Sequence, residues 1–441
     1  MGDATMQWGL LGPDFLPAQR RLRTLGVGST VRLFNELAVP GLGGLWFGKQ
    51  ALLAILGIFI AQEAMRRGKQ VSNIEASNAL EALACALSFE HTNWRQDERL
   101  RGRIKLNGRR DHSFSALRKR SAYVVQPMRM RVVQPLLALG LVTSDGGSQR
   151  FNNYRCAQPG LDFIETACGA FRPNKRSIAD NLVRWMNGDD CVSTPPTRQA
   201  LSPIEPLAQS ACKILRERMA TGGAVGERRR IAMQWVGSLS KDTKLSWSLP
   251  PAELASEHWR DLHAGGIFFR ARDAALDMLE AVEAHLSQMK MRGLELGPTL
   301  PERIGQAVST LRAAAQAYVD FGHDPIADGS ATAFCRDCLF SDPAETLRAL
   351  VRRDGRVLRL VGDLVLPGAA FRDVVDSPGA SADEAPSRII DGSENTEETG
   401  ITTEIAWPEN MSFRMANLFL LNLDLNGGLS AHLDGGSNVA Q

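Results

Sequence analysis

The chain has 441 residues, of which 44% are hydrophobic, 23% are charged and 6% are aromatic. This composition is that of a folded soluble protein, and the length exceeds what one hydrophobic core normally supports, so we expect two or three domains. The formal net charge of +2 excludes neither a nucleic-acid partner nor a protein partner, because local charges of opposite sign cancel within it.

Cysteine usage and the first residues indicate the compartment. The seven cysteines show no regular spacing apart from one pair, Cys335 and Cys338, which argues against a disulfide framework and favours a reducing environment. Residues 1–9 contain an acid and lack a continuous apolar region, so they do not resemble a signal peptide. We therefore expect a cytoplasmic protein that does not enter a membrane.

Residues 41–61 form the longest apolar stretch. Lys49 and Gln50 lie near its centre, where a charge costs about 3 kcal/mol even on insertion scales. The uninterrupted part, 51–61, is about half as long as a membrane span requires. It is therefore predicted to be a buried core helix.

The same stretch contains an apparent phosphate-binding loop. Residues 43–50 read GGLWFGKQ and fit the pattern G-x-x-x-x-G-K, with Lys49 as the phosphate-binding lysine. Gln50 stands where Ser or Thr should coordinate magnesium, and Pro40 makes the preceding residues a poor strand. A buried turn that enters a helix is the favoured interpretation, and no nucleotide cofactor is expected.

A helix is predicted over 74–90, with Asn73 as its N-cap, because apolar residues recur at helical spacing. The segment that follows is the most basic of the chain. Residues 91–131 contain twelve Lys or Arg and three acids, a net charge of +9. Such a local excess of positive charge is typical of a surface that binds a polyanion.

Residues 113–160 read as a helix, a turn, a second basic helix and a two-stranded hairpin. Ser113 is a suitable cap for the first helix, and Pro127 is a good first residue for a second helix that ends at Gly140. The hairpin strands are predicted at 141–143 and 151–156. The phrase LLALGLV followed by a hairpin resembles the winged helix-turn-helix superfamily over about a seventh of the chain.

The resemblance implies DNA binding by particular residues. The second helix would enter the major groove with Arg129 and Arg131 at base edges. Phosphates would be contacted by a further set of cations from the first helix and the hairpin: Arg118, Lys119, Arg120, Arg150 and Arg155. Pro135 departs from the pattern because it should kink the second helix, which leaves open which arginine faces the bases. Docking to a protein is the alternative use of such a module.

From 175 to 321 the pattern is helical nearly throughout. Helices are predicted at 177–185, 204–219, 228–239, 252–289 and 301–321, with Pro or Gly clusters between them. His258 and His263 are five residues apart, so they do not share a helical face, and a packing corner is favoured over a metallopeptidase site.

A small module is predicted at 331–372. It contains Cys335 and Cys338, a helix over 343–352, and a hairpin of 357–361 and 364–366 around a Gly-Asp turn. The cysteines have a zinc-ligand spacing, and His323 lies twelve residues upstream of the first one. Because a tetrahedral zinc needs four ligands and no second pair follows, two reduced cysteines in a turn are favoured over zinc.

The last part of the chain changes character twice. Residues 373–404 contain nine acids and one Arg, and too few large apolar residues to form a core, so they are predicted to be a disordered linker. Residues 407–425 are very apolar and must dock, either onto a partner or onto their own chain.

These observations predict a mainly α, multidomain protein of helical bundles with an embedded winged helix and a small α/β element near 331–372. The expected domains are 1–172, 173–330 and 331–372, followed by the linker and a docking segment over 405–441. The function they favour is non-catalytic DNA engagement and assembly in a larger complex, in settings such as bacterial genome maintenance or anti-phage defence. Protein partners are expected at the helical region and at 407–425.

Three alternatives remain open. A sequence-specific transcription regulator would need two-fold symmetry and a palindromic site. A nucleotide- or metal-dependent enzyme would need a ligand at the 43–50 loop or at the cysteine pair. In a docking scaffold without nucleic-acid binding, the basic segment would bind acidic residues of a protein.

Overall fold

The computed structural model describes residues 25–119, 121–147, 149–189, 194–288, 293–297, 299–371 and 403–436. Its residues group into two compact units, each built from separate stretches of sequence. The larger unit draws on 29–270, 320–331 and 393–441, and the smaller unit on 1–28, 271–319 and 332–392. These units differ from the predicted domain ranges, because residues 29–270 stay together and the C-terminal helices join them.

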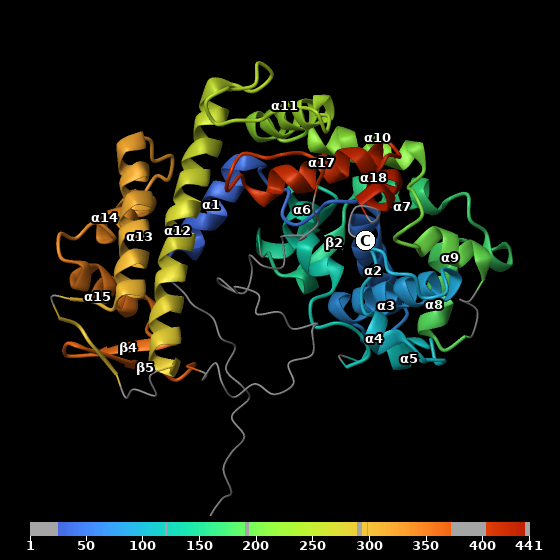
Figure 1. Cartoon of the computed structure of the whole chain (residues 1–441). Coiled ribbons are helices and arrows are strands. Elements are labelled where there is room, and N and C mark those ends of the chain that lie inside the picture. The colour runs from blue at the N-terminus through green and yellow to red at the C-terminus, as the bar shows by residue number, and fades with distance from the viewer. Residues whose placement is uncertain are drawn as a thin grey trace, which may run out of the picture. The chain divides into compact units, whose positions relative to one another are not determined.

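In its described residues, the larger unit is helical apart from one hairpin (Figure 1). Its helices are α1 (Gly28–Ala38), α2 (Gly48–Arg66), α3 (Asn73–His91), α4 (Arg103–Leu106), α5 (Phe114–Leu117), α6 (Val133–Ala138), α7 (Gln158–Cys168), α8 (Ile178–Met186), α9 (Pro195–Leu201), α10 (Gln209–Met219), α11 (Ala224–Ser238), α17 (Phe413–Leu425) and α18 (Leu429–Gly436). Strands β1 (Val142–Ser144) and β2 (Tyr154–Cys156) form an antiparallel hairpin in which Val142 pairs with Cys156. Short 3-10 turns lie at η1 (Met128–Val132), η2 (Asp145–Gly147), η3 (Phe151–Asn153) and η4 (Pro173–Lys175).

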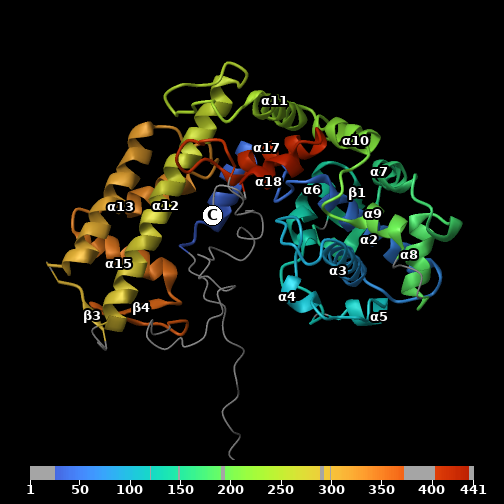
Figure 2. The same ribbon diagram turned by 45° about the vertical axis from the view of Figure 1, so that its right-hand side comes forward.

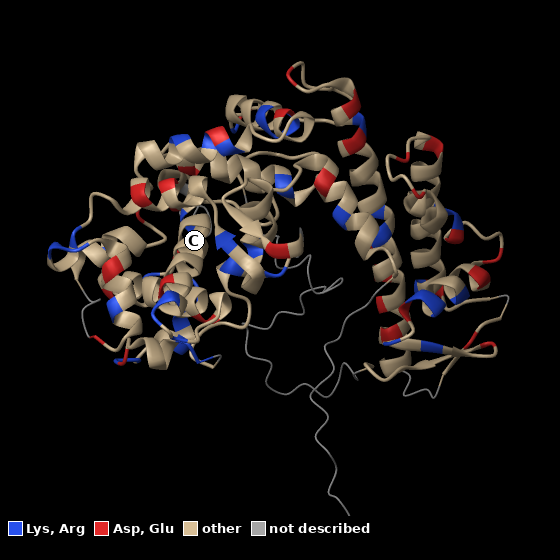
Figure 3. Cartoon of the chain, turned by 180° about the vertical axis from the view of Figure 1, so that it is seen from behind, with Lys and Arg blue, Asp and Glu red and all other residues tan. Residues whose placement is uncertain are grey.

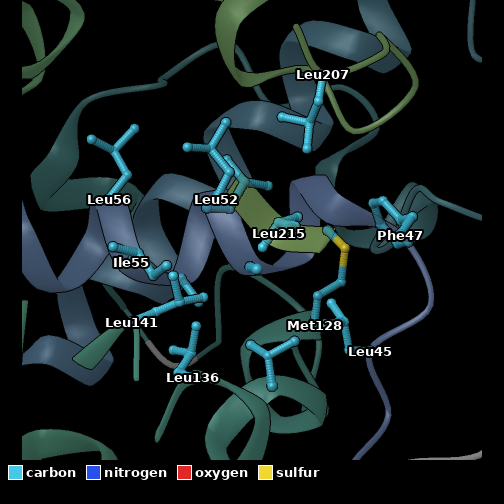
Figure 4. Close-up of a cluster of buried hydrophobic side chains, with 14 of the residues drawn as sticks. Leu45, Phe47, Leu52, Ile55, Leu56, Met128, Leu136, Leu141, Leu207 and Leu215 are labelled. Carbon is cyan, nitrogen blue, oxygen red and sulfur yellow. The ribbon is translucent and has the colours of Figure 1, made fainter. Parts of the chain in front are cut away.

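Helix α2 is the centre of the larger unit. It is the one helix in the described ranges that is long and apolar enough to cross a membrane, and 78% of that apolar window is buried inside the protein. It packs closely on α3, because a Cβ at Gly57 would lie 2.2 Å from the Ser77 hydroxyl. The side chains of Leu52, Ile55 and Leu56 lie in one buried cluster. The cluster also contains Leu136 of α6, Leu141 before β1 and Leu215 of α10 (Figure 4). The prediction of a buried core helix is confirmed.

Helix α3 begins at Asn73, one residue earlier than predicted. Ser72, rather than the predicted Asn73, is the N-cap, and its hydroxyl accepts from the Glu75 amide at 3.2 Å. Asn73 instead donates through Nδ2 to the carbonyls of Phe151 and Tyr154, both at 2.9 Å. The residue predicted to cap α3 therefore ties it to the hairpin.

Helix α17 completes the larger unit. It packs on α10 and α11, and Leu418, Leu420 and Leu425 are fully buried (Figure 1). The Asp424 carboxylate accepts from the Gly48 amide at 2.8 Å, at the start of α2. The apolar segment predicted to dock therefore docks on its own chain.

Among its described residues, the smaller unit contains three helices and a three-stranded sheet besides the second half of α12 (Ser256–Gln288), which belongs to it from Ala271 onward. The helices are α13 (Glu302–Phe321), α14 (Ser330–Asp337) and α15 (Pro343–Asp354), and the strands are β3 (Leu294–Glu295), β4 (Leu358–Val361) and β5 (Leu364–Pro367) (Figure 2). The sheet is antiparallel with the order β3-β5-β4, and Val365 pairs with both Leu294 and Leu360. The predicted helix and hairpin of this module are confirmed.

Most predicted helices are present with shifted ends. The helix expected from 204 begins at Gln209, and the one expected from 228 begins at Ala224. The helix expected from 127 to 140 is wrong as a single element, since it is divided into η1 and the six-residue α6. Residues 373–402 of the predicted acidic linker lie outside the described residues, as does Arg120.

Candidate nucleic-acid interface

The predicted order of helix, turn, helix and hairpin occurs at 113–156 with short helices. Ser113 caps α5 as predicted, and its hydroxyl accepts from the Ala116 amide at 3.3 Å. Helix α5 has four residues and α6 has six, so neither presents a long exposed face. The first hairpin strand is shifted by one residue from the predicted one, and the second begins three residues later than predicted, at Tyr154.

A buried carboxylate fixes the start of the second helix. Glu81 of α3 is 1% exposed and accepts from the amides of Met128 at 2.7 Å and Arg129 at 3.1 Å. Burial raises the pKa of Glu81, although these backbone donors oppose the shift. Because an acid of the core holds its first turn, η1 lies against the protein interior.

Arg129 is held by its own chain. Its Nε donates to Asn78 Oδ1 at 2.5 Å, and the guanidinium lies 5.5 Å from the centre of the Phe151 ring. Burial lowers the pKa of the guanidinium, and Glu81 opposes that shift. Arg129 therefore contributes to internal packing, in contrast to the base contact that the resemblance implies.

Arg131 and Pro135 lie against the loop that precedes α2. The Arg131 carbonyl accepts from the Gly44 amide at 2.9 Å. A Cβ at Gly43 would lie 2.8 Å from the Pro135 ring, so the two segments are in close contact. Pro135 occupies the first turn of α6, where a helix needs no donor from it, and the division at Val133 replaces the predicted kink.

The predicted phosphate contacts differ in exposure. Arg118 is half-buried, bonds Glu75 Oε1 at 2.5 Å and lies 5.6 Å from the centre of the Phe114 ring. Arg155 is exposed but pairs with Asp145 of the hairpin at 3.0 Å. Lys119 and Arg150 are exposed.

A wider set of exposed cations surrounds α4 and α5. Arg103, Lys105, Arg110 and Lys119 are exposed, and none has an ion-pair partner in the described part of the chain. The Lys105 ammonium donates to the Tyr123 carbonyl at 3.1 Å, which holds α4 against the core. We call these four residues the basic surface; Figure 3 shows the ribbon with all described Lys and Arg in blue. The charge count of 91–131 includes all four, whereas the winged-helix resemblance selects only Lys119.

No protein-family model matches the chain, and no curated protein or solved structure matches it significantly.

A cavity of about 370 Å³ lies beside α5 in the larger unit. Its lining includes Lys69, Arg118, Ser113 and Ser115, with the buried rings of Phe114 and Trp185 below them. Glu75 balances part of this charge through its bond to Arg118. Besides Arg118, the cavity lining includes one cation, Lys69, which has no ion-pair partner among the described residues.

The loop at 43–50 is occupied by its own chain. The Gln50 side chain accepts from the Trp46 amide at 2.9 Å, and Asp424 accepts from the Gly48 amide. Lys49 is 3% exposed and donates to the Ala200 carbonyl at 2.6 Å, and burial lowers its pKa to about 8. The groups that would bind a phosphate therefore serve the interior, as expected for a buried turn.

The cysteine pair lies in and just after α14. Cys335 and Cys338 are fully buried, and the Cys338 thiol donates to the Phe334 carbonyl at 3.3 Å. Burial raises the pKa of the Cys338 thiol to about 12. His323 belongs to the larger unit and bonds Asp261 at 2.8 Å. Among the described residues no cluster of His, Cys, Asp and Glu has a metal-binding arrangement.

The two histidines of α12 are packing residues, as predicted. His258 Nε2 lies 2.9 Å from the Ala38 carbonyl, and burial lowers the His258 pKa to about 4. The His263 ring stacks on Trp247 with 4.8 Å between ring centres. His258 is buried and His263 is half-buried, and both imidazoles pack within the larger unit.

Proposed function

We propose that this protein binds duplex DNA without acting on it chemically, as a cytoplasmic subunit of a larger assembly. The observation that carries the proposal is the basic surface, whose four exposed cations lack ion-pair partners in the described part of the chain. Exposed cations that form no internal ion pair can meet phosphates without breaking one, and they release the counterions of DNA when they bind.

The contact that we propose is with phosphates rather than with base edges. Direct readout needs a helix whose polar side chains reach into the major groove. The second helix of the winged-helix resemblance does not offer this, because Arg129 bonds Asn78 and the amides of η1 bond Glu81. Binding should therefore depend strongly on salt and weakly on sequence.

The test is the salt dependence of binding to a random-sequence duplex. A variant with Arg103→Ala, Lys105→Ala, Arg110→Ala and Lys119→Ala should flatten the log-log salt slope by about 3.6, at 0.9 per phosphate contact. The ratio of wild-type to variant affinity should then fall about 150-fold between 50 and 200 mM salt.

A matched control removes four exposed cations elsewhere in the larger unit: Lys213, Lys241, Lys244 and Arg260. The control should bind like the wild type. Absence of wild-type binding at low salt, or equal slopes for the control and the basic-surface variant, would refute the proposal.

Docking of a protein is the second candidate function. Ile104 is 73% exposed and Val125 is 71% exposed, and Ile104 lies between two cations of the basic surface. Exposed apolar side chains among cations suit an acidic protein partner with apolar residues. An Ile104→Ser, Val125→Ser variant should keep its DNA affinity under the first function. Under the second, it should lose a subunit that co-purifies with the wild type in fixed stoichiometry.

A further inference from the structure

The smaller unit repeats the order of elements that the sequence predicts at 113–160. Helix α14 is followed by a turn at 338–342, then by α15, and then by the β4–β5 hairpin, to which β3 adds a third strand. Here the second helix has twelve residues, twice the length of α6. Its inner face is well packed, since Leu347, Leu350 and Val351 are fully buried.

The junction between α15 and β4 is held rigidly. Asp342 caps α15 by accepting from the Ala344 amide at 2.9 Å. At the other end, Asp354 Oδ2 accepts from the amides of Val357 at 3.0 Å and Leu358 at 2.8 Å. Gly355 between them has φ of 57°, a conformation that favours glycine. The side chains that project from this junction therefore have a fixed backbone.

Three arginines project from the junction. Arg352 lies on the last turn of α15, Arg356 in the connection and Arg359 on β4, and all three are exposed. The Arg359 Nε donates to the Pro367 carbonyl across the hairpin at 3.2 Å, which limits its movement. We call these three residues the arginine corner.

The acids of this part of the chain do not neutralise the arginine corner. Between 331 and 371 there are five acids, and each is bonded to other groups. Asp337 bonds Arg353, Glu345 and Asp363 bond Arg348, and Asp342 and Asp354 bond backbone amides. None of the three corner arginines has an ion-pair partner in the described part of the chain. Within the described residues 331–371, the corner is therefore a local positive surface.

We infer that the arginine corner is a second binding surface for duplex DNA, which contacts phosphates independently of the basic surface. Guanidinium groups bind phosphate oxygens through two parallel N–H donors, and Arg therefore suits this contact better than Lys. The three arginines are exposed on a helix end, a turn and a strand, so several of them can meet the closely spaced phosphates of a duplex.

The acids near α15 limit the contact to this corner. Glu345 and Asp363 lie beside Arg348, and their carboxylates would repel phosphates near the first turn of the helix and the hairpin tip. The contact is therefore centred on Arg352 and its two neighbours rather than on insertion of the whole helix.

The experiment compares the full chain with an Arg352→Ala, Arg356→Ala, Arg359→Ala variant on a random-sequence DNA duplex across a salt series. Three lost phosphate contacts should flatten the log-log slope by about 2.7, at 0.9 per contact. The ratio of wild-type to variant affinity should fall about forty-fold between 50 and 200 mM salt. A Lys213→Ala, Lys241→Ala, Lys244→Ala variant removes the same charge and should keep the wild-type slope.

Two outcomes would overturn the inference. One is a slope of the corner variant equal to that of the control, with a melting temperature that shows the variant is folded. The other is a wild-type preference for single-stranded DNA or for an RNA duplex that disappears in the corner variant, because the corner would then serve a different ligand.

The inference and the proposed function can fail separately. If the basic-surface variant binds like the wild type while the corner variant is weakened, the DNA contact lies in the smaller unit and the proposed site is wrong. If only the basic-surface variant is weakened, the corner is not a DNA contact. If both are weakened, a combined variant should lose both slope contributions, so that its slope is flatter by about 6.3.

Discussion

Replacement of Glu81 tests whether its buried carboxylate holds η1, the first turn of the helical segment before the β1–β2 hairpin, in place. Glu81→Gln keeps the size of the side chain, but it places an NH₂ group where one oxygen accepts from a backbone amide. Losing a hydrogen bond to a charged group in the interior costs about 1.5–3 kcal/mol. Burial raises the pKa of Glu81, so removal of the charge also relieves a desolvation cost, and we expect a net loss near 2 kcal/mol.

The assay is thermal unfolding of the full chain, followed by circular dichroism. A loss of 2 kcal/mol should lower the melting temperature of the larger unit by roughly 3 °C, given its size. Glu98→Gln is the matched control. Glu98 is exposed in the loop after α3, and its replacement removes the same charge. A Glu81→Gln variant as stable as this control would refute the reasoning that Glu81 fixes η1 against the core.

Two further substitutions test the interior. Burial lowers the pKa of Lys49 to about 8, so the folded chain releases this proton before the unfolded chain does, and its contribution to stability rises with pH. Relative to Lys49→Met, the free energy of unfolding of the wild type, measured in urea, should rise on the order of 2 kcal/mol between pH 8 and pH 10. A difference between the two proteins that stays constant with pH would contradict the lowered pKa of Lys49. Gly160→Ala places a Cβ 2.2 Å from the Leu141 carbonyl oxygen and should cost about 1–3 kcal/mol. Gly305→Ala, in an open part of α13, should instead stabilise its unit by about 0.5–1 kcal/mol, and equal effects of the two changes would show that the close approach is not real.

The sequence predicts local elements well because their causes are local. Apolar spacing places α3, Ser113 caps α5, and the Gly-Asp turn closes the β4–β5 hairpin. The burial of α2 also follows from its composition, since no face of it is polar enough for water.

The orientation of the second helix at 128–138 could not be predicted, because it depends on a contact across 47 residues between Glu81 and the Met128 amide. No pattern within 113–160 shows that an acid of α3 will hold this turn. The same limit applies to the arginines: sequence shows that 91–131 is basic, but only the fold separates the internal Arg129 from the exposed Arg103.

The two-unit organisation is also invisible in the sequence. The predicted boundary at 172 rests on the end of a motif, whereas the larger unit continues to 270 and resumes at 393. Discontinuous units of this kind are defined by long-range packing, and single-sequence patterns contain no information about it.

The place of α17 has a consequence for how the protein folds on the ribosome. Residues 29–270 leave the exit tunnel with the surfaces of α10 and α11 uncovered, because the helix that covers them begins at Phe413. At roughly 5–20 residues per second, translation of the intervening stretch takes on the order of ten seconds. The smaller unit can fold during that interval, while the larger one waits for its last helices. The nascent chain is therefore a natural client for chaperones, and premature termination before Phe413 should yield an insoluble product.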